Sequence, residues 1–279
     1  MGKNFSKALS GAVIFLALWC LSGCQLLENP PKTWEGKVRA HHGKNSGGKL
    51  LLESIAAHGG MEKWYSNAIL SFRWTYYMKD RGPDAKIDTH QKVDLASMKA
   101  IHHVPETDIR FGWTGDDAWI DPAEAAFAVP ARFWALTPIY FVGIPFVFAD
   151  LGTQAQLLED FEFEGVTWNQ VRITFSSDSG DAPDDTYTLL IHPDKKYVGA
   201  VRYTVTSPLV TKGKVMPEKL LTMDSHTWVK GIYLPKFHRT FSMKQGRPVE
   251  KIRDAKVGEL RFLAPGSVDF RPPVGAKKL

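Results

Sequence analysis

The residues of this sequence that could perform chemistry are nine histidines, two cysteines and thirty aspartate and glutamate residues. Acid–base catalysis and metal binding both require several such groups at a suitable spacing. The adjacent carboxylates Asp116-Asp117 and Asp184-Asp185 stand in predicted turns, where aspartate commonly serves the turn geometry. The sequence contains no Gly-x-Ser-x-Gly, no His-Glu-x-x-His and no phosphate-binding glycine loop. We therefore predict no catalytic residue and no cofactor.

Two pairs of histidines suggest a metal site, but neither pair completes one. His41 and His42 are neighbours in a polar stretch, where we expect solvated side chains. His90 is expected to face His103 across two strands that a tight turn joins. A zinc site in a protein takes three or four ligands, and no third ligand is evident for either pair. We predict no metal site.

His58 stands at the end of a stretch with helical spacing, just before Gly59-Gly60. A protonated imidazole is favoured at the negative end of a helix. A catalytic role would need an acid or nucleophile partner, which the sequence does not identify. We therefore interpret His58 as a residue that ends a helix.

Cys24 carries the clearest chemical assignment. Lys3 and Lys7 precede an apolar stretch, which ends in the tetrad Leu21-Ser22-Gly23-Cys24. This tetrad resembles the lipobox of bacterial lipoproteins, and the resemblance implies cleavage before Cys24 and diacylation of its thiol. We predict that residues 1–23 are a lipoprotein signal peptide. The alternative is an ordinary secretory signal that happens to end in cysteine.

Lipidation at Cys24 predicts a stable membrane anchor, because two acyl chains bind a bilayer far more firmly than one. Gln25 occupies the position where aspartate would signal inner-membrane retention in enterobacteria, so the resemblance implies the outer membrane, with the domain facing the periplasm. Both cysteines lie within residues 1–24, which leaves none for a disulfide in the folded part. The net charge of +5 is dispersed, and we predict no nucleic-acid partner.

The remaining chain divides into a tether and one domain. Residues 24–48 contain Pro30-Pro31 and a polar, glycine-containing run, a composition typical of a flexible tether. Residues 49–279 show no second boundary and are predicted to form a single domain. The tail from Arg271 to Leu279 is expected to be loose.

Polarity alternates with a period of two through most of this domain, which predicts antiparallel strands. The first strand places Phe72, Trp74 and Tyr76 on one face, and a later strand does the same with Phe111 and Trp113. Such an inner face is unusually aromatic. In a strand near the C-terminus, the pattern assigns the inner face to Phe237, Arg239, Phe241 and Met243.

An apolar segment, residues 133–149, interrupts the strands and contains no charged residue. A helix that spans a bilayer needs about 20 apolar residues, and Pro138 and Pro145 each remove a helical hydrogen bond. We expect short helical pieces that must be covered by the fold, or contact lipid or another apolar partner.

This order of elements resembles a known family. The motifs are Ile55 to Trp64 (IAAHGGMEKW), Pro145-Phe146 and the turn Leu190 to Asp194 (LIHPD). These motifs look like those of an uncharacterised branch of lipoproteins. The order of elements behind the lipobox resembles the bacterial lipoprotein carriers and receptors LolA and LolB, whose fold that branch shares. The resemblance implies a mainly β (α+β) fold, in which a curved antiparallel sheet forms an incomplete barrel covered by short helices.

The resemblance also implies an apolar cavity that binds lipid or the acyl chains of lipoproteins without catalysis, in a transport or receptor role. Anchoring at Cys24 disfavours a freely diffusing carrier. Two alternatives remain: an assembly lipoprotein that docks a membrane-protein partner through residues 133–149, and a hydrolase of unknown type. Ten aromatic residues are predicted to contact the ligand: Phe72, Trp74, Tyr76, Phe111, Trp113, Phe133, Trp134, Tyr140, Phe141 and Phe146.

Overall fold

The computed structural model describes residues 32–78, 81–176 and 182–279 of the chain. The predicted signal peptide and Cys24 lie outside these residues, so the lipid anchor stays a prediction. No helix among the described residues is long and apolar enough to cross a bilayer.

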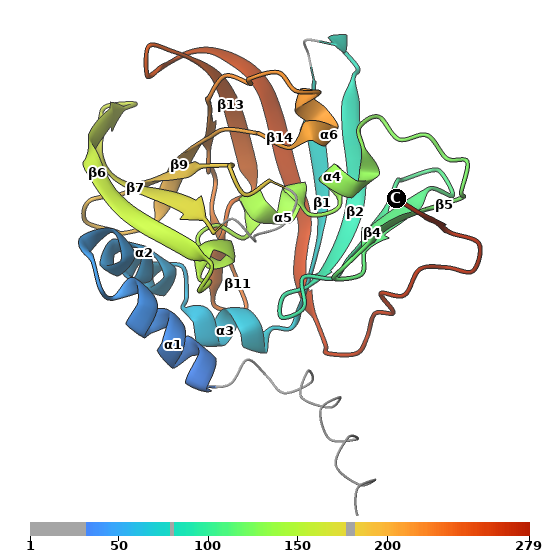
Figure 1. Ribbon diagram of the computed structural model, residues 1–279, viewed down its shortest axis with the longest axis horizontal. Helices are drawn as coiled ribbons and strands as arrows, with labels where there is room; N and C mark the ends of the chain where they lie inside the picture. The colour runs from blue at the N-terminus through green and yellow to red at the C-terminus, as the bar shows by residue number, and fades with distance from the viewer. Residues whose placement is uncertain (1–31, 79–80, 177–181) are drawn as a thin grey trace, which may run out of the picture.

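Within the described residues, thirteen strands form one antiparallel sheet in the order β15-β5-β4-β3-β2-β1-β14-β13-β10-β9-β8-β7-β6 (Figure 1). The small hairpin β11-β12 stands apart from it. The strands are β1 (Ile69–Tyr77), β2 (Lys86–Asp94), β3 (Ala100–His103), β4 (Arg110–Trp113), β5 (Ala118–Asp121), β6 (Thr153–Phe163), β7 (Val166–Phe175), β8 (Tyr187–Ile191), β9 (Val198–Tyr203), β10 (Lys219–Thr222), β11 (Thr227–Val229), β12 (Ile232–Leu234), β13 (Phe237–Lys244), β14 (Arg247–Leu263) and β15 (Lys277–Lys278).

The sheet curves strongly but remains open, with β15 and β6 as its two edges (Figure 1). The prediction of an incomplete antiparallel barrel is therefore confirmed. The alternation expected for β1 is also confirmed, since Leu70, Phe72 and Trp74 are all at most 1% exposed. His90 lies opposite His103, as the sequence predicted.

Short helices cover the concave face and one end of the sheet (Figure 1). Helices α4, α5 and η2 are short, and together they contain most of the apolar segment, whose prediction as short helical pieces is confirmed. The helices are α1 (Lys32–His42), α2 (Ser46–Ala57), α3 (Met61–Ser66), α4 (Ala131–Trp134), α5 (Thr137–Val142), η2 (Phe146–Phe148) and α6 (Pro208–Thr211).

The prediction that residues 24–48 form a flexible tether is wrong from Lys32 onward, because α1 packs on the domain. Val38 is fully buried, and His42 is 2% exposed and donates from Nε2 to the Asp150 carbonyl at 3.1 Å. Gly47 lies so close to the β6 backbone that a Cβ would stand 2.5 Å from the Leu157 nitrogen. The glycines that suggested flexibility are thus required by close packing.

The C-terminal tail is also more ordered than predicted. Lys277 and Lys278 form β15 and pair with Ile120 and Trp119 of β5. The Leu279 amide donates to the Ala118 carbonyl at 2.9 Å. The end of the chain is fixed because it extends an exposed sheet edge, where unpaired backbone groups are available.

The face assignment on β13 is wrong. His238 and Thr240 are at most 1% exposed and face the main core, whereas Phe241 and Met243 pack on the opposite face. There they join a second, smaller apolar cluster made of Phe163, Trp168, Leu190, Ala200 and Leu220. Because both faces of this part of the sheet are covered, polarity alone does not identify the inner one.

Buried histidines link distant segments through backbone hydrogen bonds. His58 donates from Nδ1 to the Tyr233 carbonyl at 2.8 Å, and its Nε2 accepts from the Val198 amide at 3.0 Å. The prediction that His58 ends a helix is confirmed, since His58 is the C-cap of α2, but burial lowers the pKa of His58 to about 4 and leaves the imidazole neutral there. Burial likewise lowers the pKa of His102 and of His238 to about 4.

The buried, neutral histidines should make the folded protein less stable at acidic pH. Their ordinary pKa is 6.5, and the folded values lie near 4, so the unfolded chain binds more protons between these pH values. We expect the free energy of unfolding to decrease as the pH falls from 6.5 toward 4, by up to about 1.4 kcal/mol per pH unit for each histidine. Urea unfolding over this range measures it.

His102→Gln should make that pH dependence shallower, since one titrating group is lost. The matched control His103→Gln, at the exposed neighbouring position, should leave the slope unchanged. A stability independent of pH between these values would contradict the assignment of neutral, buried histidines.

Candidate functional site

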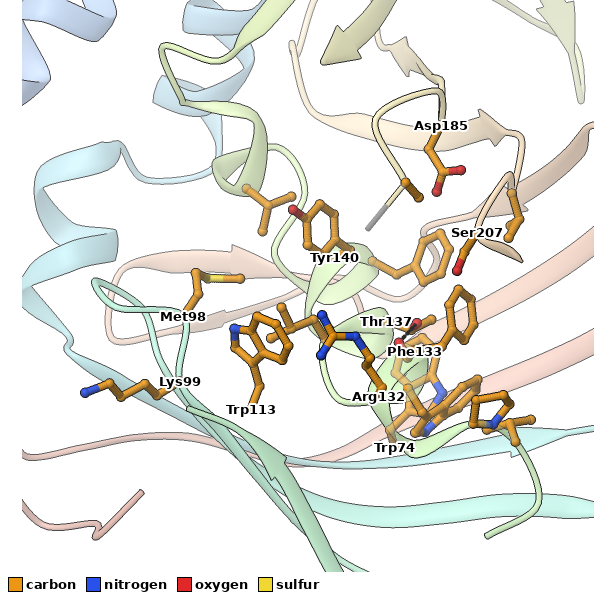
Figure 2. A pocket seen from close by; sticks show the side chains of 18 of the residues that line it. Trp74, Met98, Lys99, Trp113, Arg132, Phe133, Thr137, Tyr140, Asp185 and Ser207 are labelled. Atoms are coloured by element: carbon orange, nitrogen blue, oxygen red, sulfur yellow. Dashed lines mark hydrogen bonds between the residues drawn. The ribbon is translucent and has the colours of Figure 1, made fainter. Parts of the chain in front are cut away.

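A cavity of about 1750 Å³ lies between the concave face of the sheet and the short helices. Strands β1, β2 and β4 contribute one wall, the apolar segment contributes the cover, and α6 with the loop after it closes one end. Figure 2 shows some of the lining side chains, among them Trp74 of β1, Trp113 of β4 and Tyr140 of α5. Aliphatic side chains in the wall include Met78, Ile87, Leu136, Val147, Val205 and Leu209.

Eight of the ten aromatic residues that the sequence suggested lie in this wall: Trp74, Tyr76, Trp113, Phe133, Trp134, Tyr140, Phe141 and Phe146. The other two, Phe72 and Phe111, do not line the cavity and are packed within the core. Phe111 instead stacks on His102 with ring centroids 4.4 Å apart. The structure thus brings together the aromatic residues of β1 and of the apolar segment.

Aromatic pairs hold the apolar segment on the sheet and on α3. Phe146 stacks on Trp64 with centroids 4.5 Å apart and planes inclined by 4°. The ring centroids of Trp134 and Tyr76 are 5.6 Å apart, and those of Phe141 and Tyr203 are 5.0 Å apart. Such contacts contribute beyond the area they bury. Each short helical piece is therefore fixed separately, although none of them is long enough to be stable alone.

A hydrogen bond that sequence reasoning missed adds to this attachment. His102 on β3 donates from Nε2 to the carbonyl of Ala135, the residue that ends α4, at 2.8 Å. The period of two in β3 could have identified this buried histidine. His102 alternates with Ala100 on the buried face of the strand, whereas His103 is exposed. The two histidines that the sequence suggested as a pair are less buried: His90 is partly exposed and His103 is exposed. No group of three or more metal-binding side chains occurs among the described residues.

Neutral phenols make up much of one wall. Burial raises the pKa of Tyr140, Tyr187 and Tyr203, so these hydroxyls remain protonated at physiological pH. Tyr187 and Tyr203 stack with centroids 6.3 Å apart. The interior of the cavity is therefore mainly apolar with neutral polar groups, a combination typical of sites for small molecules.

The cavity is also lined by charged side chains. Arg132 on α4 places its guanidinium 5.0 Å from the centre of the Trp113 ring, and Figure 2 shows the two side chains next to each other. The remaining basic side chains of the wall are Arg81, Lys99, Lys212, Lys214, Lys219, Arg253 and Arg271. The acidic ones are Asp94, Asp150, Asp185 and Asp269.

Comparison with known proteins identifies the fold. No family model matches the sequence, and no curated protein does. The chain is similar to a domain described as belonging to an outer membrane lipoprotein-sorting protein of Vibrio parahaemolyticus, at 11% identity and a TM-score of 0.51, covering 79% of this chain and 93% of that one. It is also similar to a LolA superfamily protein from Nitrosomonas europaea, at 10% identity and a TM-score of 0.51, with 79% and 94% covered.

A DUF1329 family protein from Desulfovibrio piger gives a similar match, at 12% identity and a TM-score of 0.51, covering 83% of this chain and 95% of that one. Identities this low establish a shared architecture and leave ligand and pathway open. The chain therefore has a LolA-like fold.

The wall residues differ in how much the fold depends on them. Phe146 is 1% exposed and fully packed on Trp64, so Phe146→Ala should lower the free energy of unfolding by about 3–5 kcal/mol. Phe133 is only partly buried and borders open space, so Phe133→Ala should cost about 1 kcal/mol or less. Urea denaturation of both variants measures the difference. Equal losses would show that no open cavity lies beside Phe133.

Proposed function

We propose that this protein is an outer-membrane lipoprotein that binds lipid, or the acyl chains of another lipoprotein, in the cavity between its sheet and the apolar segment. The role is transport or reception without catalysis. The observation that carries the proposal is the cavity itself, which at about 1750 Å³ exceeds the roughly 300–1,000 Å³ of ordinary small-molecule sites. A ligand of that size with few polar groups is an acyl chain or several of them.

The energetics of the wall support this ligand class. Apolar surface removed from water gains roughly 25 cal/mol per Å². An acyl chain that buries a few hundred Å² against Phe133, Tyr140 and Leu136 therefore gains several kcal/mol. The similarity to proteins of the LolA superfamily and of lipoprotein sorting agrees with the same ligand class.

The arrangement of the apolar segment favours this proposal over docking of a membrane-protein partner. Ile139, Val142 and Phe148 are fully buried in the protein's own core, so they offer no surface to another chain. The partly buried side chains, Phe133 and Tyr140, border the cavity. A docking segment would instead present its apolar side chains outward.

The environment of the buried histidines favours binding over hydrolysis. His58, His102 and His238 each donate a hydrogen bond to a backbone carbonyl. Burial keeps all three neutral, with pKa values of about 4. None of them lines the cavity, so they act as structural links and not as general bases for a bound ligand.

The proposed anchor would hold the domain close to the membrane. Residues 25–31 separate Cys24 from the start of α1 at Lys32. Seven residues span at most roughly 25 Å when fully extended. An acylated Cys24 would therefore keep the cavity near the bilayer surface from which a lipid enters, as a receptor or stationary carrier requires.

Native mass spectrometry tests the proposal. The Cys24→Ser chain, made without residues 1–23 and purified without detergent, should carry a lipid adduct of discrete mass. Phe133→Glu should abolish the adduct, because it places a charge in the apolar wall. The matched control Phe161→Glu, at a partly buried position outside the cavity, should retain it. A clean unliganded mass, with no uptake of added fatty acid, would contradict the proposed function.

A further inference from the structure

We propose that the cavity selects anionic amphiphiles, and that Lys212 and Lys214 hold the anionic headgroup at the end formed by α6 and its following loop. The inference rests on the proposed function and assigns its ligand class. Acyl chains alone do not distinguish fatty acids and phosphate-bearing lipids from neutral glycerides. The charged side chains around the cavity can distinguish the anionic lipids from the neutral ones.

The wall carries twice as many basic side chains as acidic ones, eight against four. Each of the four carboxylates accepts a hydrogen bond from a residue close to it in the sequence or just beyond a neighbouring strand. Asp94 accepts from the Ser97 amide at 2.8 Å, and Asp150 accepts from the Gly152 amide at 2.7 Å. Asp269 pairs with Arg271, with Oδ2 and Nη2 2.7 Å apart. Each carboxylate keeps its negative charge, so the wall retains an excess of four basic side chains, eight less four.

Asp185 is the carboxylate beside α6. Its Oδ1 accepts from the Thr206 amide at 2.6 Å and from the Thr206 hydroxyl at 2.8 Å. Burial raises the pKa of Asp185, which makes its negative charge less favourable. The neighbouring Glu218 is paired with Arg202, with Oε2 and Nη2 2.8 Å apart, and does not line the cavity. Neither acid forms an ion pair with the two lysines of the proposed headgroup site among the described residues, since Asp185 bonds Thr206 and Glu218 bonds Arg202.

The chain topology gathers the lysines at one end. Helix α6 and residues 212–218 connect β9 to β10, two strands that pair with Lys219 opposite Tyr203. Lys212, Lys214 and Lys219 are therefore close to the same rim of the sheet, and all three line the cavity. Lys212 and Lys214 are exposed and form no ion pair among the described residues. They can turn toward a headgroup without breaking an existing contact.

Two further features of this end suit an amphiphile. Ser207, which precedes α6, is 2% exposed, and its hydroxyl has no hydrogen-bond partner among the described residues. It lies in the cavity wall near Asp185 (Figure 2). Leu209 and Val205 lie beside it and provide apolar surface. A ligand with its chain along the aromatic wall and its headgroup at Lys212 and Lys214 would contact both kinds of surface.

The test compares myristate with its neutral glycerol monoester, so that the acyl chain is the same and only the charge differs. Each displaces the neutral fluorescent probe N-phenyl-1-naphthylamine from the Cys24→Ser chain made without residues 1–23. We expect myristate to bind about tenfold more tightly at low ionic strength, and the preference to shrink as salt is raised toward 1 M, where the Debye length is about 3 Å.

The double variant K212Q/K214Q should lose most of the preference for myristate while its affinity for the neutral ester stays unchanged. The control K92Q/K195Q removes two exposed lysines that do not line the cavity, and it should behave as the unchanged chain. Preserved binding of the neutral ester also shows that K212Q/K214Q remains folded.

Three results would contradict the inference. Equal affinity for the two ligands would overturn charge selection while leaving the proposed function intact. A preference that survives in K212Q/K214Q would overturn the assignment to these lysines. Failure of the probe and of both ligands to bind would contradict the proposed function, and the inference with it.

Discussion

The constraint on which this structure depends is that a strongly curved sheet with two free edges leaves one apolar face to be covered. Strand β15 and strand β6 do not meet, so the sheet cannot bury its own interior by closing. Short helical pieces cover the face instead. Because these pieces are too short to be stable alone, each depends on a specific contact: Phe146 on Trp64, Trp134 on Tyr76, and the Ala135 carbonyl on His102.

This way of covering the sheet leaves the cavity. A single long helix would pack continuously along the sheet, whereas pieces interrupted at Pro138 and Pro145 touch it at separate points. The space between those points is bordered by side chains that are only partly buried, such as Phe133 and Tyr140. Residues that attach the segment to the sheet and residues that border the cavity are thus neighbours in one segment. We infer that Lys212 and Lys214 beside α6 would then favour an anionic ligand over a neutral one.

The sequence predicted the elements whose signal is local. The period of two identified β1 and its inner face, and the turn after β2 set the register that places His90 opposite His103. It failed where packing between distant segments decides the outcome. Gly47 and Gly48 have the composition of a linker, but α2 needs them for close approach to β6 and α1. On β13, Phe241 and Met243 have the polarity of an inner face, although a second apolar cluster on the outer face receives them.

The central claim is that an acyl chain enters the space beneath the apolar segment. Methyl NMR with a fatty acid spin-labelled near the end of its chain tests it most directly, since the label broadens only nearby signals. We expect the strongest broadening at Leu136, Val147 and Leu209, which line the cavity, and weaker broadening at Leu190 and Leu220 of the opposite cluster. Broadening confined to Leu190 and Leu220, or absent altogether, would contradict it.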